Sequence, residues 1–568
     1  MKVYIKGKGE VNLGQKDFVA QGGEKKIFAI GNTAYAVYDP PSNMIPMGKI
    51  QELAVLKNPN IVVPQDVLLD AKNRPIGYTM RFLKDTHALC QLFTRTFQQQ
   101  NNLSQDKMLE LVTAFRDMIE DIHQNNILVV DLNEMNFLTD KKFREVYGID
   151  TNSYQTKSFP ATVIMESIKD RHCGGKFTTG TDWFSWGIVS FQMLVGIHPY
   201  KGRHPDFEKL PLDQRLDARM KQNISVFHAG ATMPKVCNPL DSIPPALKAW
   251  YIAVFEKGER MDPPLDFEQI VKLVAKSQHI SGGNKFTIIQ LEQYEGEVWW
   301  HYMSFGTRAV CTEQGIYLNR RKYNYPNKMA IGFSPKMNRA WGGYLDTNYN
   351  HLMLVDLATG TERSHVINAQ NIMSYGGRIY VQGGTNIMEV MFSEMGDNTI
   401  TSTKVVGNVL NAPGATHAFD GVFVQNLLGR YVASIFPESG KCHQINIQEL
   451  DGYRLVDAKY LNKVLVVVAE KGGKYNRFVF RLSDDYRQYD YRTVDDVPNT
   501  GINFTVTDAG ICVLMDEEER VEVFSNKRGS AQRTVIDDPV LESDMKLFSD
   551  GSQVLFAKDN RLFSMAMK

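Results

Sequence analysis

The chain has 568 residues, of which 43% are apolar and 23% are charged, an ordinary composition for a globular protein with room for more than one core. Its 64 Lys and Arg residues balance its 64 Asp and Glu residues, so no overall charge would attract nucleic acid or an anionic membrane. The longest apolar runs, such as IVSFQMLVGI, fall well short of the roughly 18–20 residues that a membrane-spanning helix needs. We therefore expect no membrane span, and nucleic acid is not an expected partner.

The N-terminal sequence MKVYIKGKGEVNLG lacks the apolar core of a secretory signal peptide. Six cysteines lie at positions 90, 173, 237, 311, 442 and 512, without a CxxC pair. This distribution is typical of reduced thiols rather than of a disulfide or zinc framework. We expect a cytoplasmic protein.

The first half of the chain, to about residue 275, begins with strand-like sequence and continues with helical sequence. KIFAIGNTAYAVYD is strand-like, whereas KMLELVTAFRDMIEDIH has apolar residues at three- and four-residue steps, as an amphipathic helix does. DWFSWGIVSFQMLVGI is apolar on nearly all sides, which predicts a buried helix. Strands followed by helices predict an α+β body with two lobes, at about 1–85 and 86–275.

A turn-rich stretch at 276–286 contains Ser-Gly-Gly-Asn and predicts a linker. The remainder, 287–568, is rich in short apolar segments of β type. They begin at 315, 378, 421, 463, 510 and 553.

After residue 378 these segments recur about every 43 residues, which is the repeat of a β-propeller blade. Six phased segments predict an all-β propeller of six blades, with five or seven as alternatives. The longer interval from 315 to 378 is interpreted as one blade with an excursion between Tyr323 and Gly343. A large sandwich or two small β domains would also give β-rich sequence, but neither requires a period.

The first body carries short polar motifs in the order found in protein kinases. Gly22 and Gly23 lie between two strand-like segments, where backbone amides without side chains could approach a phosphate. In VVDLNEMNFL, Asp131 and Asn136 lie five positions apart, as in the kinase catalytic loop HRDLxxxxN. Two valines stand where that loop has His and Arg.

Two further aspartates follow in the same order. Asp150 ends an apolar run in VYGIDTNSYQ, where kinases place the metal-binding Asp of DFG. Asp182 opens DWFSWG, in the manner of a kinase helix whose Asp holds the catalytic-loop backbone. Together the four signals predict a bilobal, protein-kinase-like fold.

These segments, with FQMLVGIHPYKG and AVFEKGERMDPP, resemble a bacterial protein-kinase-like family in which some members carry helix-hairpin-helix domains. The family has the patterns GGEGxVY…AKIY, GDLNxxN, IDxDS and GxHPFxG. The resemblance covers roughly residues 10–275 and none of the predicted propeller. It implies that Asp131 orients the attacking hydroxyl or accepts its proton, and that Asn136 and Asp150 hold Mg²⁺ against the phosphates of ATP.

The chain departs from the family at the lysine that anchors the phosphates. Alignment places Ala36 at the usual position of that lysine, whereas Lys25 occupies the last glycine position of the Gly-rich loop. The with-no-lysine kinases carry their anchoring lysine there, so Lys25 is the candidate, with Lys26 on the other face of the strand. The alternative is a solvated hairpin tip. Glu52 is the candidate partner of this lysine on the first helix.

Two structural roles are also predicted. Glu166 and Arg260 would form an ion pair that holds the activation segment, and His198 would be a packed histidine rather than a catalytic base. RRKYNYPNK, at 320–328, interleaves cations and aromatic residues, and we interpret it as an exposed loop rather than as a nucleic-acid groove.

The sequence thus predicts a cytoplasmic, ATP- and Mg²⁺-dependent protein kinase, Ser/Thr-directed, whose propeller binds a protein substrate or partner. The alternatives are a pseudokinase scaffold and a small-molecule phosphotransferase. An amine of Lys25 directed towards Asp150 would favour activity.

Overall fold

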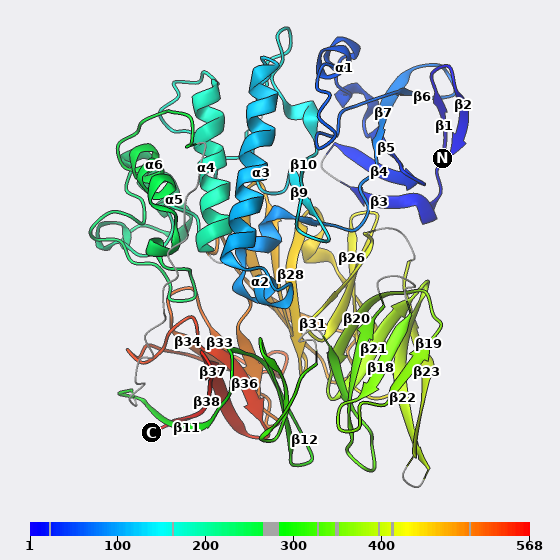
Figure 1. Ribbon diagram of the computed structural model, residues 1–568, viewed down its shortest axis with the longest axis vertical. Helices are drawn as coiled ribbons and strands as arrows, with labels where there is room; N and C mark the ends of the chain where they lie inside the picture. Colours follow the sequence, from blue (N-terminus) through cyan, green and yellow to red (C-terminus); the bar gives the residue numbers. More distant parts are fainter. Residues whose placement is uncertain are drawn as a thin grey trace.

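The computed structural model describes residues 1–21, 24–161, 164–264, 283–325, 329–346, 351–395, 398–410, 414–498 and 501–568. Two bodies are stacked along its long axis (Figure 1). The first body, within residues 1–264, consists of a sheet followed by helices. The second, from residue 283 onward, consists of four-stranded sheets. Of the predicted linker at 276–286, residues 276–282 lie outside the described ranges, as do Gly22 and Gly23.

The first body begins with an antiparallel sheet in the order β2-β1-β6-β7-β5-β4-β3. Its strands are β1 Lys2–Ile5, β2 Gly9–Asn12, β3 Phe18–Gln21, β4 Lys25–Ile30, β5 Thr33–Tyr38, β6 Val67–Leu69 and β7 Pro75–Arg81. One face buries an apolar cluster around Phe18 and Phe28. The other face buries Ala36 and Tyr78 against Ile50 of helix α1 (Met47–Leu53).

Helices dominate the rest of the first body, as the order of patterns in the sequence predicted. They are α2 Arg95–Gln100, α3 Gln105–Gln124, α4 Thr179–Val195, α5 Leu212–Gln222 and α6 Pro245–Phe255. Ser104 begins α3 by accepting a hydrogen bond from the Lys107 amide. The apolar face of α3 lies against α4, which is buried on all sides in its interior turns.

A short antiparallel sheet lies between the two lobes of this body, in the order β10-β9-β8. Its strands are β8 Thr86–Ala88, β9 Phe137–Asp140 and β10 Val146–Gly148. Because β9 and β10 form a hairpin, the residues just before β9 and just after β10 lie side by side.

Within the described residues, the second body contains seven four-stranded antiparallel sheets, and the arrangement is propeller-like. The first four sheets in chain order comprise β12 Val298–Ser304, β13 Thr307–Thr312, β14 Gly315–Leu318, β15 Arg321–Tyr323, β16 Ala330–Phe333, β17 Ala340–Leu345, β18 Leu352–Asp356, β19 Glu362–His365, β20 Ala369–Tyr375, β21 Arg378–Gly383, β22 Asn386–Met395, β23 Asn398–Asn408, β24 Thr416–Phe419, β25 Val422–Leu427, β26 Arg430–Ile435 and β27 His443–Ile447.

The next two sheets comprise β28 Arg454–Leu461, β29 Val464–Lys471, β30 Lys474–Leu482, β31 Tyr489–Val494, β32 Phe504–Val506, β33 Ile511–Met515, β34 Val521–Ser525 and β35 Arg533–Ile536. The last sheet joins the two ends of this body, since β11 (Phe286–Gln293) pairs with β38 (Arg561–Met567). Its inner strands are β36 Lys546–Asp550 and β37 Gln553–Lys558.

The prediction of six blades was wrong by one sheet. The presumed excursion between Tyr323 and Gly343 contains the start of a separate sheet, namely β16 and part of β17, and this sheet continues to β19. Its second strand has the sequence AWGGYL, in which Gly342 and Gly343 interrupt the apolar pattern. A Cβ at Gly342 would lie 2.5 Å from the Met329 sulfur. Packing thus requires a glycine where the sequence pattern requires an apolar side chain.

In the part of the chain that the structure describes, no helix is both long enough and apolar enough to cross a membrane.

Candidate functional site

The β9–β10 hairpin brings Asn136 and Asp150 to one place. Asn136 immediately precedes β9, and Asp150 follows β10 by two residues. The Ile149 amide donates to the Asn136 carbonyl at 2.9 Å, which fixes the two segments side by side. Asp150 adopts φ 61°, in the left-handed region that is uncommon for a residue with a side chain. Such backbone conformations concentrate at functional sites.

Asp131 lies beside this hairpin in a dense set of hydrogen bonds. Its Oδ2 accepts from the side-chain amides of Asn133 at 3.0 Å and Asn136 at 3.1 Å, and its Oδ1 accepts from the Met165 backbone amide at 2.9 Å. Burial raises the pKa of Asp131, the nearby charge of Asp150 adds to this rise, and the three hydrogen bonds oppose it. Asp131 is thus a half-buried carboxylate with both oxygens engaged.

Asp182, at the start of α4, holds the backbone before Asp131. Its carboxylate accepts from the Val129 amide at 2.7 Å and the Val130 amide at 2.9 Å, and it contacts His123 Nε2 at 2.9 Å. Val130 has φ 61°, which is unfavourable for a β-branched residue. The buried Asp182 carboxylate stabilises this conformation. The two valines at 129 and 130 therefore contribute their backbone amides to this contact.

Lys25 reaches the same place from the sheet. In the β4–β5 register, Ile27 lies opposite Ala36 and Lys25 lies opposite Tyr38, so Lys25 and Ala36 are on the same face. The Lys25 ammonium donates to the carboxylate of Asp150. The side chain of Lys25 is 15% exposed, so this is a largely buried ion pair rather than a solvated hairpin tip.

The charge of Lys25 controls the ionisation of Asp150. Burial alone raises the pKa of Asp150, but the charge and hydrogen bond of Lys25 outweigh that effect and take the pKa below its usual range. Lys26, in contrast, pairs with the exposed Asp39 at 3.0 Å. The two adjacent lysines therefore have different roles, as strand alternation predicted.

Three residues that the sequence analysis did not single out complete the environment of Lys25. Asn152 Oδ1 accepts from the Lys25 ammonium, and the Tyr78 hydroxyl lies 3.3 Å from both. Lys49 of α1 donates to the Asn152 carbonyl at 2.7 Å. Asn152 occupies the position of the second acidic residue in IDxDS, and that motif was the available signal. Nothing in the local sequence marks Lys49 or Tyr78.

Glu52 lies apart from Lys25. Its carboxylate accepts from the Ser158 amide at 3.1 Å, so it contacts the activation segment. The residue of α1 that faces the site is the buried Lys49, one turn of the helix earlier. Helix α1 thus presents a cation where the sequence analysis expected a carboxylate.

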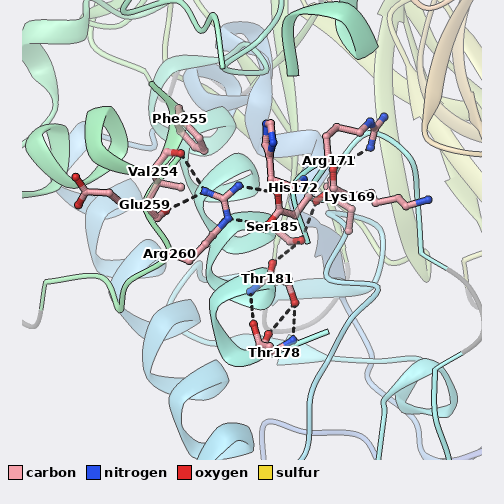
Figure 2. Close-up of polar contacts among 12 residues, drawn as sticks. Lys169, Arg171, His172, Thr178, Thr181, Ser185, Val254, Phe255, Glu259 and Arg260 are labelled. Atoms are coloured by element: carbon pink, nitrogen blue, oxygen red, sulfur yellow. Dashed lines mark hydrogen bonds and ion pairs between the residues drawn. The ribbon is translucent and has the colours of Figure 1, made fainter. Parts of the chain in front are cut away.

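The predicted pair between Glu166 and Arg260 is replaced by another. Arg260 makes two hydrogen bonds to Asp170, at 2.7 Å from Nε and 2.6 Å from Nη2, whereas the exposed Glu166 pairs with Lys169 and Arg171. Figure 2 shows the Arg260 side chain extending between the Val254 and Glu259 carbonyls and the start of α4. The partner of Arg260 thus lies four residues after the predicted one. The chain turns at residues 166–168, between Glu166 and Asp170.

Two other predicted features have simple surroundings. His198 is buried, its Nε2 lies 2.9 Å from the Ser167 carbonyl, and burial lowers its pKa to about 3, so it is a neutral packed histidine. In the stretch 320–328, Arg321–Tyr323 forms β15, the outer strand of its sheet, and residues 326–328 lie outside the described ranges.

The donor set around Asp150 suits a magnesium ion that also binds phosphates. Mg²⁺ prefers hard oxygen ligands and commonly uses one or two protein groups with substrate phosphates. The side-chain amide nitrogen of Asn136 donates to Asp131, so the side-chain oxygen of Asn136 is the atom that could serve as a metal ligand. In the described ranges, no group of three or more His, Cys, Asp or Glu residues could hold a metal alone.

Comparison with known proteins gives a weak similarity to kinases. No protein-family profile matches the chain. A probable serine/threonine-protein kinase of Dictyostelium discoideum is 29% identical over 166 residues, 28% of this chain and 12% of the relative. PK-1, a kinase of the Cydia pomonella granulovirus, aligns over 36% of this chain and 74% of its own, with 14% identity and a TM-score of 0.28, which carries no argument. The sequence similarity supports a protein-kinase-like relationship.

Proposed function

We propose that the chain is an ATP- and Mg²⁺-dependent protein kinase, directed to Ser or Thr, in which Lys25 replaces the lysine that is absent at Ala36. The contact between the Lys25 ammonium and Asp150 is the observation that carries this proposal. It supplies a cation at the metal-binding aspartate from the neighbouring strand, on the same face as Ala36. Phosphoryl transfer depends mainly on positioning and charge neutralisation, so one ammonium serves from either strand.

Each residue would have a distinct part in this reaction. Lys25 would bind phosphate oxygens once the nucleotide enters, and Asp131 would accept the proton of the attacking hydroxyl. Asn136 and Asp150 would hold Mg²⁺, which would supply charge neutralisation of the phosphates. The raised pKa of Asp131 makes it a stronger base than an ordinary aspartate.

A pseudokinase scaffold is the second candidate, and one observation favours it. Both oxygens of Asp131 already accept hydrogen bonds, one of them from the Met165 amide of the activation segment. A carboxylate held in this way can be structural. In this alternative the second body would bind a protein partner, and the first would bind nucleotide or nothing.

The experiment compares adjacent lysines and the two aspartates in the full-length chain. Phosphate transfer from labelled ATP to a general protein substrate is measured with Mg²⁺, and nucleotide binding is measured separately by calorimetry. We expect Lys25→Met, Asp131→Asn and Asp150→Asn to lower the transfer rate by about 100-fold or more. Lys26→Met, which removes only the exposed pair with Asp39, should match the wild type.

The kinase and the pseudokinase predict different results for the wild-type protein. Transfer that depends on Lys25, Asp131 and Asp150 supports the kinase. Nucleotide binding without transfer would support the pseudokinase, and equal transfer by all variants would indicate a contaminating kinase and refute the proposed activity.

A further inference from the structure

The β29–β30 hairpin of the second body reaches the catalytic loop of the first. Tyr475, the second residue of β30, donates its hydroxyl to the carboxylate of Glu134, which lies between Asp131 and Asn136. Glu134 is 2% exposed and Tyr475 is 5% exposed, so the bond is sealed from solvent. A hydrogen bond to a buried carboxylate contributes more than an exposed one, because the unpaired group would be costly.

The turn of the same hairpin lies against the activation segment. Gly473 has φ 81°, and a Cβ there would lie 2.4 Å from Met165 Cγ and 3.1 Å from the Ser167 hydroxyl. This contact leaves no space for a side chain between the hairpin and the segment. Met165 is the residue whose amide donates to Asp131 Oδ1 at 2.9 Å. The hairpin, the segment and the candidate catalytic base are therefore in successive contact.

The second body makes further contacts with the first body. Lys201, beyond α4, donates to the buried Asp496 carboxylate at 2.9 Å and to the Val497 carbonyl at 3.1 Å. On the sheet side, a Cβ at Gly429 would lie 3.6 Å from the Gln21 side chain at the end of β3. Figure 1 shows the sheets that contain β26 and β28 below β3 and the β9–β10 hairpin. The second body thus contacts both lobes.

We propose that the β29–β30 hairpin is an autoinhibitory element that holds the activation segment on Asp131 and closes the site to protein substrates. This inference rests on the kinase activity proposed above. The hairpin contacts the catalytic loop and the segment, whereas Lys25, Tyr78 and Asn152 contact one another from within the first body. The hairpin therefore blocks the protein substrate and leaves nucleotide binding intact. A partner that draws the second body away would activate the enzyme.

The test uses two adjacent glycines that differ only in what they face. Both have positive φ, which Asn tolerates better than most residues. Gly473→Asn inserts a side chain against Met165, whereas a Cβ at Gly472 meets nothing within 4 Å, so Gly472→Asn is the matched control. Hydrogen–deuterium exchange of residues 164–169, transfer to a protein substrate, and nucleotide affinity are measured for both full-length variants.

We expect Gly473→Asn to increase exchange in 164–169 and to raise kcat/KM for the protein substrate by about tenfold, with nucleotide affinity unchanged. Gly472→Asn should match the wild type. Unchanged exchange in Gly473→Asn would refute the hold of the hairpin on the segment. Faster exchange with unchanged or lower transfer would refute inhibition and assign the hairpin a supporting role.

A second pair of variants guards against a folding defect. Tyr475→Phe removes the hydroxyl that bonds to Glu134, and Tyr489→Phe removes a similar bond to Glu449, at 2.6 Å, within the second body. Of these two tyrosine variants, Tyr475→Phe should raise transfer and Tyr489→Phe should match the wild type. If wild type and all variants bind nucleotide without transferring phosphate, the proposed kinase activity fails, and with it the inhibition. The exchange measurement still decides separately whether the hairpin holds the segment.

Discussion

The ammonium of Lys49 donates a hydrogen bond to the backbone carbonyl of Asn152, whose side chain accepts from Lys25. One residue of the site is therefore held by two lysines from different elements, α1 and β4. Lys49 is 6% exposed, and burial lowers its pKa. A buried lysine of this kind is costly unless it is hydrogen-bonded, which indicates that it positions Asn152.

The first prediction concerns this positioning role. Lys49→Met keeps the length of the side chain but loses the bond to Asn152, so we expect nucleotide affinity to fall about tenfold, less than for Lys25→Met. Lys57→Met is the control, because Lys57 donates to the Ala54 carbonyl at 2.7 Å in an exposed position. Calorimetric titration measures both. Equal affinities for the two variants would contradict a positioning role for Lys49.

The second prediction concerns the backbone before Asp131. Asp182→Asn replaces one carboxylate oxygen with an NH₂ group that faces backbone donors, so one of the bonds to Val129 and Val130 becomes repulsive. We expect the free energy of unfolding of the first body to fall by about 2–3 kcal/mol. Urea denaturation, monitored by tryptophan fluorescence, measures the change. Asp117→Asn, at an exposed position on α3, should change it little; a similar loss in both variants would contradict the special role of Asp182.

The third prediction follows from the pair that replaced the expected one. Burial raises the pKa of Asp170, but the hydrogen bonds and charge of Arg260 take it below its usual range. A carboxyl whose pKa is lower in the folded state stabilises the fold above its unfolded pKa, and this contribution is lost as the pH falls through the folded pKa. The wild type should thus lose more stability than Asp170→Asn does as the pH falls below about 4, the usual pKa of an aspartate.

Glu166→Gln is the control for this pH dependence. Its carboxylate is exposed and pairs with Lys169 and Arg171 at the surface, so the variant should follow the wild-type curve. Denaturation midpoints at several pH values measure the difference. Parallel curves for Asp170→Asn and the wild type would mean that the Arg260 pair does not stabilise the segment.

The fourth prediction concerns the thiols, all six of which are free. Burial raises the pKa of Cys90, Cys237, Cys311 and Cys512, and it raises the pKa of Cys442 to about 11, so these five groups form little thiolate near pH 8. Cys173 is half-exposed. A thiol reagent should react rapidly with one group in the native protein, and Cys173→Ser should abolish that phase. Rapid reaction of several thiols would indicate an open core.

The elements that could be predicted were those with a strong local pattern. The helix α3 follows from Val112, Phe115 and Ile122 on one face, and α4 follows from a segment that is apolar on nearly all sides. The sheet β16–β19 was missed because its central strand packs through Gly342 and Gly343, and glycine carries no apolar signal. A search for periodic apolar side chains cannot detect this strand, because its packing depends on two glycines that have no side chain.

The residues of the candidate site also fall into two groups, those that the local sequence marks and those that it does not. Asp131, Asn136, Asp150 and Asp182 lie in short segments whose own sequence marks them, and the structure brings them together. Lys25 could be inferred from strand alternation and from the gap at Ala36. Lys49, Tyr78 and Asp170 act through partners distant in sequence, and a single sequence gives no signal for such pairs.

The pairing of β11 with β38 has a mechanical consequence. The strand that leads from the first body into the second is also the outer edge of the last sheet, with Phe286 opposite Met567. Tension between the two bodies would therefore load this ladder, beginning at that residue pair, before it reached the other sheets. A pull that separated the bodies could peel β11 away from β38, so the joint would yield at the pairing that holds the two ends of the second body together.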